Sequence, residues 1–200
     1  MKISPTLTEV KEIAKTGQYD ILPVSCEILS DFITPIEAMR ILQNVSTHCY
    51  LLEAAQANEA WGRYTFLGYD PKLEINCIDG HMKLGKLSVE TENPSEYIRQ
   101  ILSEYKSPKF DYLPSFTGGL VGYFSYDYLG YKEKSIRGKA RDTEDFKDVD
   151  LMLFDKVIAF DNLCQKIILI ANMSLDAPET GYNKAIVELM QLRELLMQGE

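Results

Sequence analysis

The chain has 200 residues, 46% of them hydrophobic and 26% charged, as in an ordinary globular protein with enough chain to bury a core. Its formal net charge of −9 argues against a nucleic-acid partner, because binding phosphates requires a basic face. No apolar run approaches the roughly 18 residues of a membrane span, and the first residues lack the apolar region of a signal peptide. We therefore expect one cytoplasmic domain over residues 1–200, with no membrane association.

Metal-binding spacings are absent from the sequence. The four cysteines lie far apart, without a C-x-x-C pattern, and are expected to be reduced core residues: Cys26, Cys49, Cys77 and Cys164. The histidines, His48 and His81, do not form an H-E-x-x-H pattern. We therefore predict neither a metal site nor a cofactor site in this chain.

Capping signals mark the starts of three helices. In each, a side chain that caps helices precedes a glutamate by three residues: Thr6 and Glu9, Thr34 and Glu37, Asn93 and Glu96. Apolar residues then recur at helical spacing: Leu7, Val10, Ile13, Ala14; Ile36, Met39, Leu42, Val45; Ile98, Ile101, Leu102, Tyr105. A fourth, longer helix is predicted at the end of the chain, with one apolar face: Tyr182, Ile186, Leu189, Met190, Leu196.

Strand patterns fill the stretches between the helices. "CYLLE", "RYTFLGYD" and "KLEINCID" read as strands, and Asp79-Gly80 is a hairpin turn leading into "HMKLGKLSVE". A second hairpin joins "KVIAFD" to "KIILIANM" through Asp161-Asn162. Short turns require antiparallel pairing. The predicted fold class is therefore α+β, a mainly antiparallel β-sheet with flanking helices.

Two further stretches differ in composition: residues 135–148 have few apolar residues and mixed charge, and "FTGGLVGYFSYDYLGY" has glycines among β-forming residues. Residues 135–148 are predicted to be a solvated, mobile loop. "FTGGLVGYFSYDYLGY" does not match a phosphate-binding glycine pattern, so its glycines, Gly118, Gly119 and Gly122, are expected to allow close approach of backbones or a bulge. Its tyrosines are predicted to be packing residues: Tyr123, Tyr126 and Tyr128.

The best candidate for a binding site is the stretch "LLEAAQANEAWGRYTFLGYDP", since no nucleophile with a recognisable base is present. Glu53 can receive an ammonium group, Leu51 or Leu52 can flank an apolar side chain, and Arg63 can hold a carboxylate. Together these groups suit an amino acid ligand. The alternative is that Glu53 and Arg63 pair with each other across a hairpin.

Four blocks in this order resemble the N-terminal region of anthranilate synthase component I, a chorismate-utilising family: "LPVSCEILSDFITPIEAMRIL", "YLLEAAQANEAWGRYTFLGYDP", "FTGGLVGYFSYDYLGY" and "DLMLFDKVIAFDN". The resemblance runs from about residue 20 to about residue 173. It implies the N-terminal, regulatory and structural domain of an enzyme that converts chorismate and ammonia to anthranilate and pyruvate in tryptophan biosynthesis.

The resemblance also implies partners. The family's C-terminal chorismate-binding domain carries catalysis and binds Mg²⁺, and a glutamine amidotransferase subunit supplies ammonia. None of those C-terminal motifs is present here, so this chain alone is expected to be inactive. The family's inhibitory tryptophan site uses an L-L-E-S element, which Leu51, Leu52 and Glu53 match, whereas Ala54 replaces the serine. Arg63 and Tyr64 match the strand start that follows. The implied tryptophan contacts are therefore Leu52, Glu53, Ala54, Arg63 and Tyr64.

Two other functions remain open from the sequence. The chain could be the same domain of the aminodeoxychorismate synthase large subunit, which makes a folate precursor. It could also be a stand-alone amino-acid-binding module. The presence of chorismate-binding motifs in the full-length reading frame would distinguish the module from the two enzymes, and product analysis would distinguish the enzymes.

Overall fold

The computed structural model describes residues 2–54, 62–133, 135 and 146–199, which divide into two compact units. Unit 1 comprises Met1–Asp70, Tyr105–Gly118 and Asp155–Glu200, and unit 2 comprises Pro71–Glu104 and Gly119–Phe154. Because each unit is assembled from separate segments, neither is a continuous stretch of sequence. The single domain expected over residues 1–200 stays a prediction.

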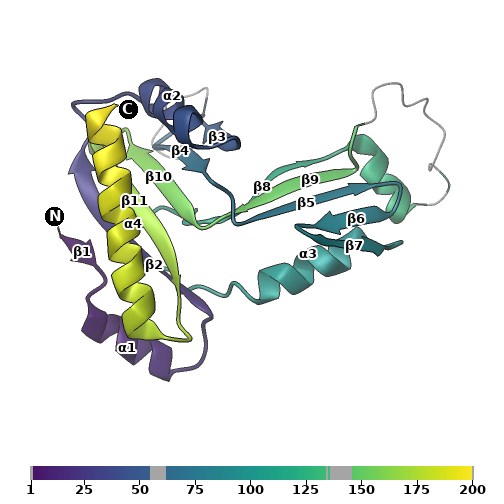
Figure 1. Ribbon diagram of the computed structural model, residues 1–200, viewed down its shortest axis with the longest axis horizontal. Helices are drawn as coiled ribbons and strands as arrows, with labels where there is room; N and C mark the ends of the chain where they lie inside the picture. The colour runs from purple at the N-terminus through teal and green to yellow at the C-terminus, as the bar shows by residue number, and fades with distance from the viewer. Residues whose placement is uncertain (1, 55–61, 134, 136–145, 200) are drawn as a thin grey trace. The chain divides into compact units, whose positions relative to one another are not determined.

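Unit 1 contains a six-stranded sheet in which every pairing is antiparallel (Figure 1). In spatial order its strands are β1 (Ile3–Ser4), β2 (Ile21–Leu29), β11 (Lys166–Ser174), β10 (Lys156–Asp161), β4 (Tyr64–Tyr69) and β3 (Cys49–Leu52). The predicted hairpin of β10 and β11 is confirmed, with Asp161 opposite Lys166. The strand β2 was not predicted.

Helices α1 (Leu7–Lys15) and α2 (Pro35–Val45) begin where the capping signals predict. At α1 the Thr6 hydroxyl accepts from the Glu9 N–H, and the Glu9 carboxylate accepts from the Thr6 N–H. This exchange pairs two amides of the first turn that have no partner within the helix. Thr34 makes the same capping box at α2.

Helix α4 (Pro178–Gln198) lies along the sheet of unit 1, as Figure 1 shows. Its buried residues follow alternating steps of three and four: Tyr182, Ala185, Leu189, Leu192 and Leu196. Met190 was predicted on this face but is exposed, because it follows Leu189 directly and so points about 100° away around the helix. The same correction applies to Ile36 and Val45 of α2, whose buried face is Ala38, Ile41 and Leu42.

Strands β10 and β11 are apolar on both faces, because both faces are covered. One face packs in the core that includes α4, through Ile158, Phe160, Leu169 and Ala171. The other face contributes Val157, Ala159, Ile168 and Ile170 to a second cluster with Leu113. Cys26 lies in the first core, where burial raises the pKa of its thiol to about 11.

Unit 2 contains a five-stranded antiparallel sheet. In spatial order its strands are β7 (Leu87–Glu90), β6 (His81–Leu84), β5 (Leu73–Ile78), β9 (Val149–Phe154) and β8 (Gly119–Phe124). Asp79 and Gly80 form the predicted hairpin turn with φ of 48° and 86°. Gly122 has a φ of 153°, and a Cβ there would lie 2.0 Å from the Asp150 carbonyl oxygen, which confirms close backbone approach.

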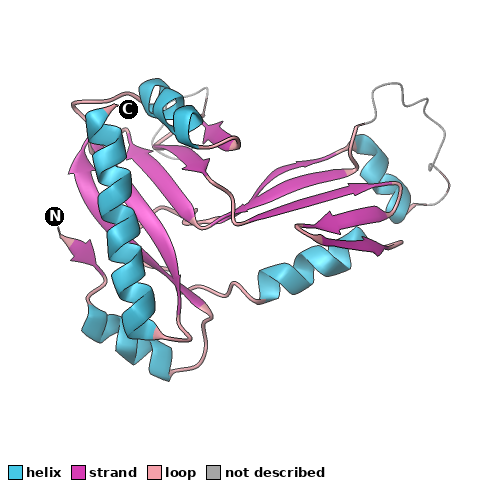
Figure 2. Cartoon of the chain, in the orientation of Figure 1, coloured by secondary structure: helices cyan, strands magenta, loops and turns pink. Residues whose placement is uncertain are grey.

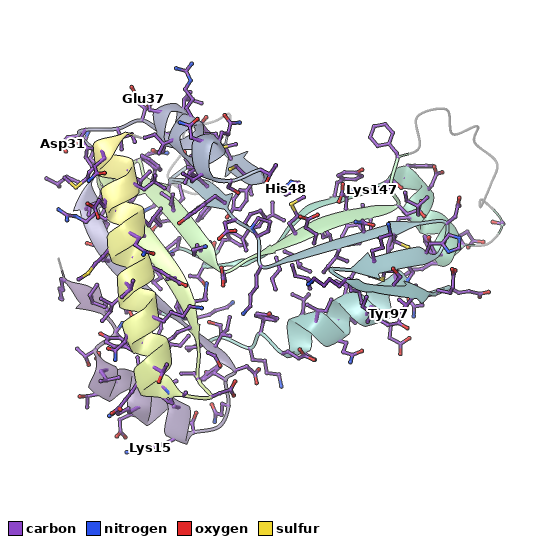
Figure 3. The ribbon with its side chains drawn as sticks, viewed as in Figure 1. Lys15, Asp31, Glu37, His48, Tyr97 and Lys147 are labelled. Atoms are coloured by element: carbon purple, nitrogen blue, oxygen red, sulfur yellow. The ribbon has the colours of Figure 1, made fainter. Side chains whose placement is uncertain are left out.

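Helix α3 (Pro94–Ser103) and the 3₁₀ helix η1 (Tyr126–Tyr131) complete unit 2. Ile98 and Ile101 of α3 lie in the core of unit 2 as predicted, together with Tyr97, labelled in Figure 3, whereas Leu102, predicted on the face of Ile98 and Ile101, is exposed. The capping box predicted at Asn93 is wrong, because its side-chain oxygen accepts from the Ser95 hydroxyl instead. Of the three tyrosines predicted to pack, Tyr128 does so, but the other two are exposed: Tyr123 and Tyr126.

Two sheets with helices confirm the α+β class (Figure 2). All four cysteines are free, but only two are buried as predicted: Cys26 and Cys77. Most of the predicted loop 135–148, from residue 136 to 145, lies outside the described residues. Among the described helices, none has the length and apolar character needed to cross a membrane.

Candidate functional site

The residues of the candidate site flank two neighbouring strands at one end of the sheet in unit 1. Leu52 is the last residue of β3, with Glu53 and Ala54 directly after it, while Arg63 immediately precedes Tyr64, the first residue of β4. Leu52 lies opposite Phe66 in the antiparallel pairing of these strands. The fold therefore brings both halves of the predicted site to the same end of the sheet. Residues 55–61, including Trp61, lie outside the described residues.

The first half of the site is open to solvent. Strand β3 is at the edge of the sheet, and Leu52, Glu53 and Ala54 are all exposed. Within the described residues the Glu53 carboxylate makes no hydrogen bond or ion pair. A carboxylate in this state can accept charge-assisted hydrogen bonds from a ligand without first breaking a pair with any described residue.

The second half is a tightly built cluster around a buried carboxylate. Arg63 binds Asp161 through two hydrogen bonds, from Nε to Oδ1 at 3.1 Å and from Nη2 to Oδ2 at 2.7 Å. Asp161 is fully buried, at the end of β10, and lies opposite Tyr64. Its Oδ1 also accepts from the backbone N–H groups of Leu163 and Cys164, at 3.2 and 3.1 Å. All the partners of this carboxylate are thus donors.

Charge at this cluster is balanced within the protein. Burial acts to raise the pKa of Asp161, but the hydrogen bonds from Arg63 and the Cys164 N–H outweigh it and hold that pKa below its ordinary value. The guanidinium lies 4.9 Å from the centre of the Tyr64 ring, and Nη2 is 3.7 Å from the Cys164 sulfur. Asp161 therefore fixes both the orientation of Arg63 and its protonation.

Neighbouring contacts hold the start of β4 rigidly. The Asn162 side-chain amide donates to the Thr65 hydroxyl at 3.3 Å, and the Asn162 N–H donates to the Arg63 carbonyl at 2.8 Å. The Tyr64 ring packs against Phe66, with ring centroids 5.8 Å apart. These bonds tie β4 to the turn that follows β10, so the second half of the site is preorganised.

The pairing of Glu53 with Arg63, considered as the alternative in the sequence analysis, is not formed; the carboxylate that Arg63 pairs with is that of Asp161. Sequence reasoning missed Asp161, although the turn residues Asp161-Asn162 were recognised. The missing information was that β10 pairs with β4, which places Asp161 beside Tyr64. No group of three or more His, Cys, Asp or Glu suited to a metal ion occurs in the part of the chain that is described.

No protein-family model matches the chain. The chain is, however, 33% identical to anthranilate synthase component 1 of Acetivibrio thermocellus over 198 residues, 96% of this chain and 39% of that protein. It is 35% identical to the same component of Pseudomonas aeruginosa, covering 95% of this chain and 39% of that protein. A crystal structure of anthranilate synthase component I from Streptococcus pneumoniae matches 83% of this chain and 36% of that chain, with a TM-score of 0.53 and 25% identity.

The sequence resemblance is thus confirmed by proteins from several organisms and by a solved structure. The chain spans about two fifths of the length of the curated relatives that it matches. In sequence and in fold, the chain is a relative of anthranilate synthase component 1.

Proposed function

We propose that this chain is the N-terminal, regulatory and structural domain of an anthranilate synthase component I. The observation that carries the proposal is 33–35% identity over about 95% of the chain to proteins of that name. The complete enzyme would convert chorismate and ammonia to anthranilate and pyruvate. The remaining three fifths of the relatives' length would hold the chorismate and Mg²⁺ sites, a separate glutamine amidotransferase subunit would supply the ammonia, and the enzyme would act in the cytoplasm.

We further propose that residues 52–54 and 63–64 form part of a tryptophan feedback site. Glu53 is accessible and free of internal partners among the described residues, so it would receive the ligand ammonium. Leu52 would flank the indole, and Arg63 with Tyr64 would form the opposite wall. Because Asp161 holds Arg63 in place, Arg63 would attract the ligand carboxylate without changing its own rotamer.

The enzyme proposal is tested on the full-length protein by incubation with chorismate, ammonium and Mg²⁺. We expect the fluorescence of anthranilate to appear with the full-length protein and not with residues 1–200 alone. Chromatographic identification of the product separates this function from aminodeoxychorismate synthesis. Full-length protein that makes no anthranilate would contradict the proposal, and binding of an amino acid by the chain alone would then favour a stand-alone module.

The feedback site is tested by titrating tryptophan against the active full-length enzyme. Glu53→Ala should remove most of the inhibition, because the ammonium would be desolvated without a counter-charge. Ala54→Ser should restore one hydrogen bond of about 1.4 kcal/mol, and so tighten inhibition about tenfold. Glu12→Ala, which changes an exposed glutamate of α1, is the matched control. An unmoved inhibition curve for Glu53→Ala would show that tryptophan does not bind here.

A further inference from the structure

The sheet of unit 2 has two edges that differ in character. One edge is β7, a four-residue strand that ends in Glu90 and follows Lys86, and Glu90 also pairs with His81. Short strands and charges are the usual protection of an edge against further pairing. The other edge is β8, with six residues, GLVGYF, and no charge. In the described part of the chain β8 pairs only with β9, so no described strand pairs with its second backbone edge.

The 3₁₀ helix that follows β8 adds apolar surface at the same place. With three residues per turn, positions three apart lie on the same face of such a helix. Tyr128 and Tyr131 form the inner face, packed on the core of unit 2 with their ring centroids 5.7 Å apart. Tyr126 and Leu129 form the outer face and are 80% and 48% exposed. The outer face therefore carries large apolar side chains without a packing role in unit 2.

Three more exposed aromatic residues flank the β8 edge, on both faces of the sheet because successive strand residues point to opposite faces. Tyr123 and Phe124 are at the end of β8, and the ring of Phe146 meets Tyr123 edge-on, with centroids 6.4 Å apart. We define the β8 edge patch as Tyr123, Phe124, Tyr126, Leu129 and Phe146, which are between 39% and 80% exposed. Next to it Lys147, labelled in Figure 3, donates to Asp150 at 2.9 Å, so a charge pair borders the apolar patch.

We propose that the β8 edge patch is a docking surface for the part of the relatives that this chain does not match, and that the contact is made by a β-strand added to β8. The proposal rests on the proposed function. Two observations identify the occupant. The unprotected edge offers unpaired backbone groups to an added strand, with aromatic side chains to cover it. The relatives also carry about three fifths of their length beyond the matched part, which supplies the strand.

A second copy of this chain is a poorer occupant. Two copies would bring together chains with a formal net charge of −9 each, and like charges oppose association. The patch itself contains no acidic or basic residue that could offset this repulsion. A strand that belongs to the same protein, by contrast, is held at a high effective concentration.

Amide hydrogen exchange on the full-length protein tests the proposal. Peptides covering residues 119–131 should exchange at least about tenfold more slowly in the full-length protein than in residues 1–200 alone, because the added strand pairs with the β8 amides. Peptides covering β7, at residues 87–90, should exchange equally in both. Equal exchange of residues 119–131 in the two proteins would overturn the proposal.

Variants test the apolar part of the contact. In the full-length protein, Tyr126→Asp combined with Leu129→Asp should abolish most of the protection of β8, whereas Leu87→Asp, an exposed residue on the opposite edge, should leave it intact. If protection of residues 119–131 in the chain alone rises with its concentration to the full-length level, the occupant is a second copy. If protection appears only when a separate subunit is added, the occupant is that subunit. Either result would overturn the proposal.

The exchange measurement does not depend on catalysis, so the two proposals can fail separately. Protection of β8 in a full-length protein that makes no anthranilate would contradict the proposed function and leave the docking surface standing. An active enzyme in which β8 is not protected would contradict the docking surface and leave the proposed function standing.

Discussion

Replacing Arg63 with alanine leaves the buried carboxylate of Asp161 without its counter-charge. Removing one partner of a buried ion pair costs about 3–5 kcal/mol. The Arg63 side chain is 38% exposed, so water partly reaches the vacated position, and we expect a loss of about 2–3 kcal/mol in the free energy of unfolding. The two backbone N–H bonds to Asp161 remain, which is why the loss stays below the upper figure.

The assay is unfolding in urea, followed by circular dichroism, at pH 7 and again below pH 4. Urea is preferred to guanidinium chloride because salt screens the ion pair. The pKa of Asp161 is lowered in the folded state, so its stabilisation is complete above the unfolded pKa and is lost as pH falls through the folded pKa. The difference in the free energy of unfolding between wild type and Arg63→Ala should therefore become smaller below about pH 4.

Lys15→Ala is the control for this experiment, because Lys15 pairs with Glu12 where both side chains are mostly exposed. It should change stability by less than about 1 kcal/mol. Equal urea midpoints for wild type and Arg63→Ala at pH 7 would refute the inference that the pair holds this end of the sheet. A difference that stays constant through low pH would refute the part assigned to Asp161.

Three further expectations concern packing and accessibility. Leu189→Ala should cost about 2–5 kcal/mol in thermal or urea unfolding, whereas Met190→Ala, one residue along α4 and exposed, should cost less than about 1 kcal/mol. Gly122→Ala should destabilise unit 2 by more than about 2 kcal/mol, because a Cβ would collide with a backbone oxygen of β9, while Gly17→Ala, at φ 63° with open space, should cost about 1 kcal/mol. Iodoacetamide should modify exposed Cys164 first, by mass spectrometry, and the buried thiols only after unfolding. Equal losses of stability for Leu189→Ala and Met190→Ala, or for Gly122→Ala and Gly17→Ala, would contradict the packing described here. Modification of a buried thiol as early as Cys164 would contradict the assigned burial.

The local elements were predictable because their signals are local. Capping boxes join residues three apart, and the hairpin at Asp79-Gly80 is specified by its own turn residues. The prediction missed β2, which contains Pro23. Pro23 lies opposite Asn172 of β11, but β1 reaches only Ser25 and Cys26, so at Pro23 no described strand pairs with the second side of β2 and the missing N–H costs no ladder bond. That tolerance depends on the neighbouring strands and cannot be read from the strand itself.

Helix faces were predicted less well than helix positions. Apolar residues at spacings of three and four allow more than one face when the helix carries extra apolar residues, as with Leu189 and Met190. In the candidate site, the ends of β3 and β4 were placed correctly by the hairpin pattern. The partner of Arg63 was not, since Asp161 is 98 residues away and only the pairing of β10 with β4 brings the two together.

The order of strands in both sheets has a consequence for synthesis of the protein on the ribosome. In unit 1, β11 lies between β2 and β10, and in unit 2, β9 lies between β5 and β8, so the strands that join each sheet are made after residue 148. At roughly 5–20 residues per second, β2 waits on the order of 7–30 s for β11 to be translated. During that time the backbone edge of β2 that later pairs with β11 has no partner strand. We therefore expect the nascent chain to bind chaperones that shield apolar segments, and shortening that wait should improve the yield of folded protein.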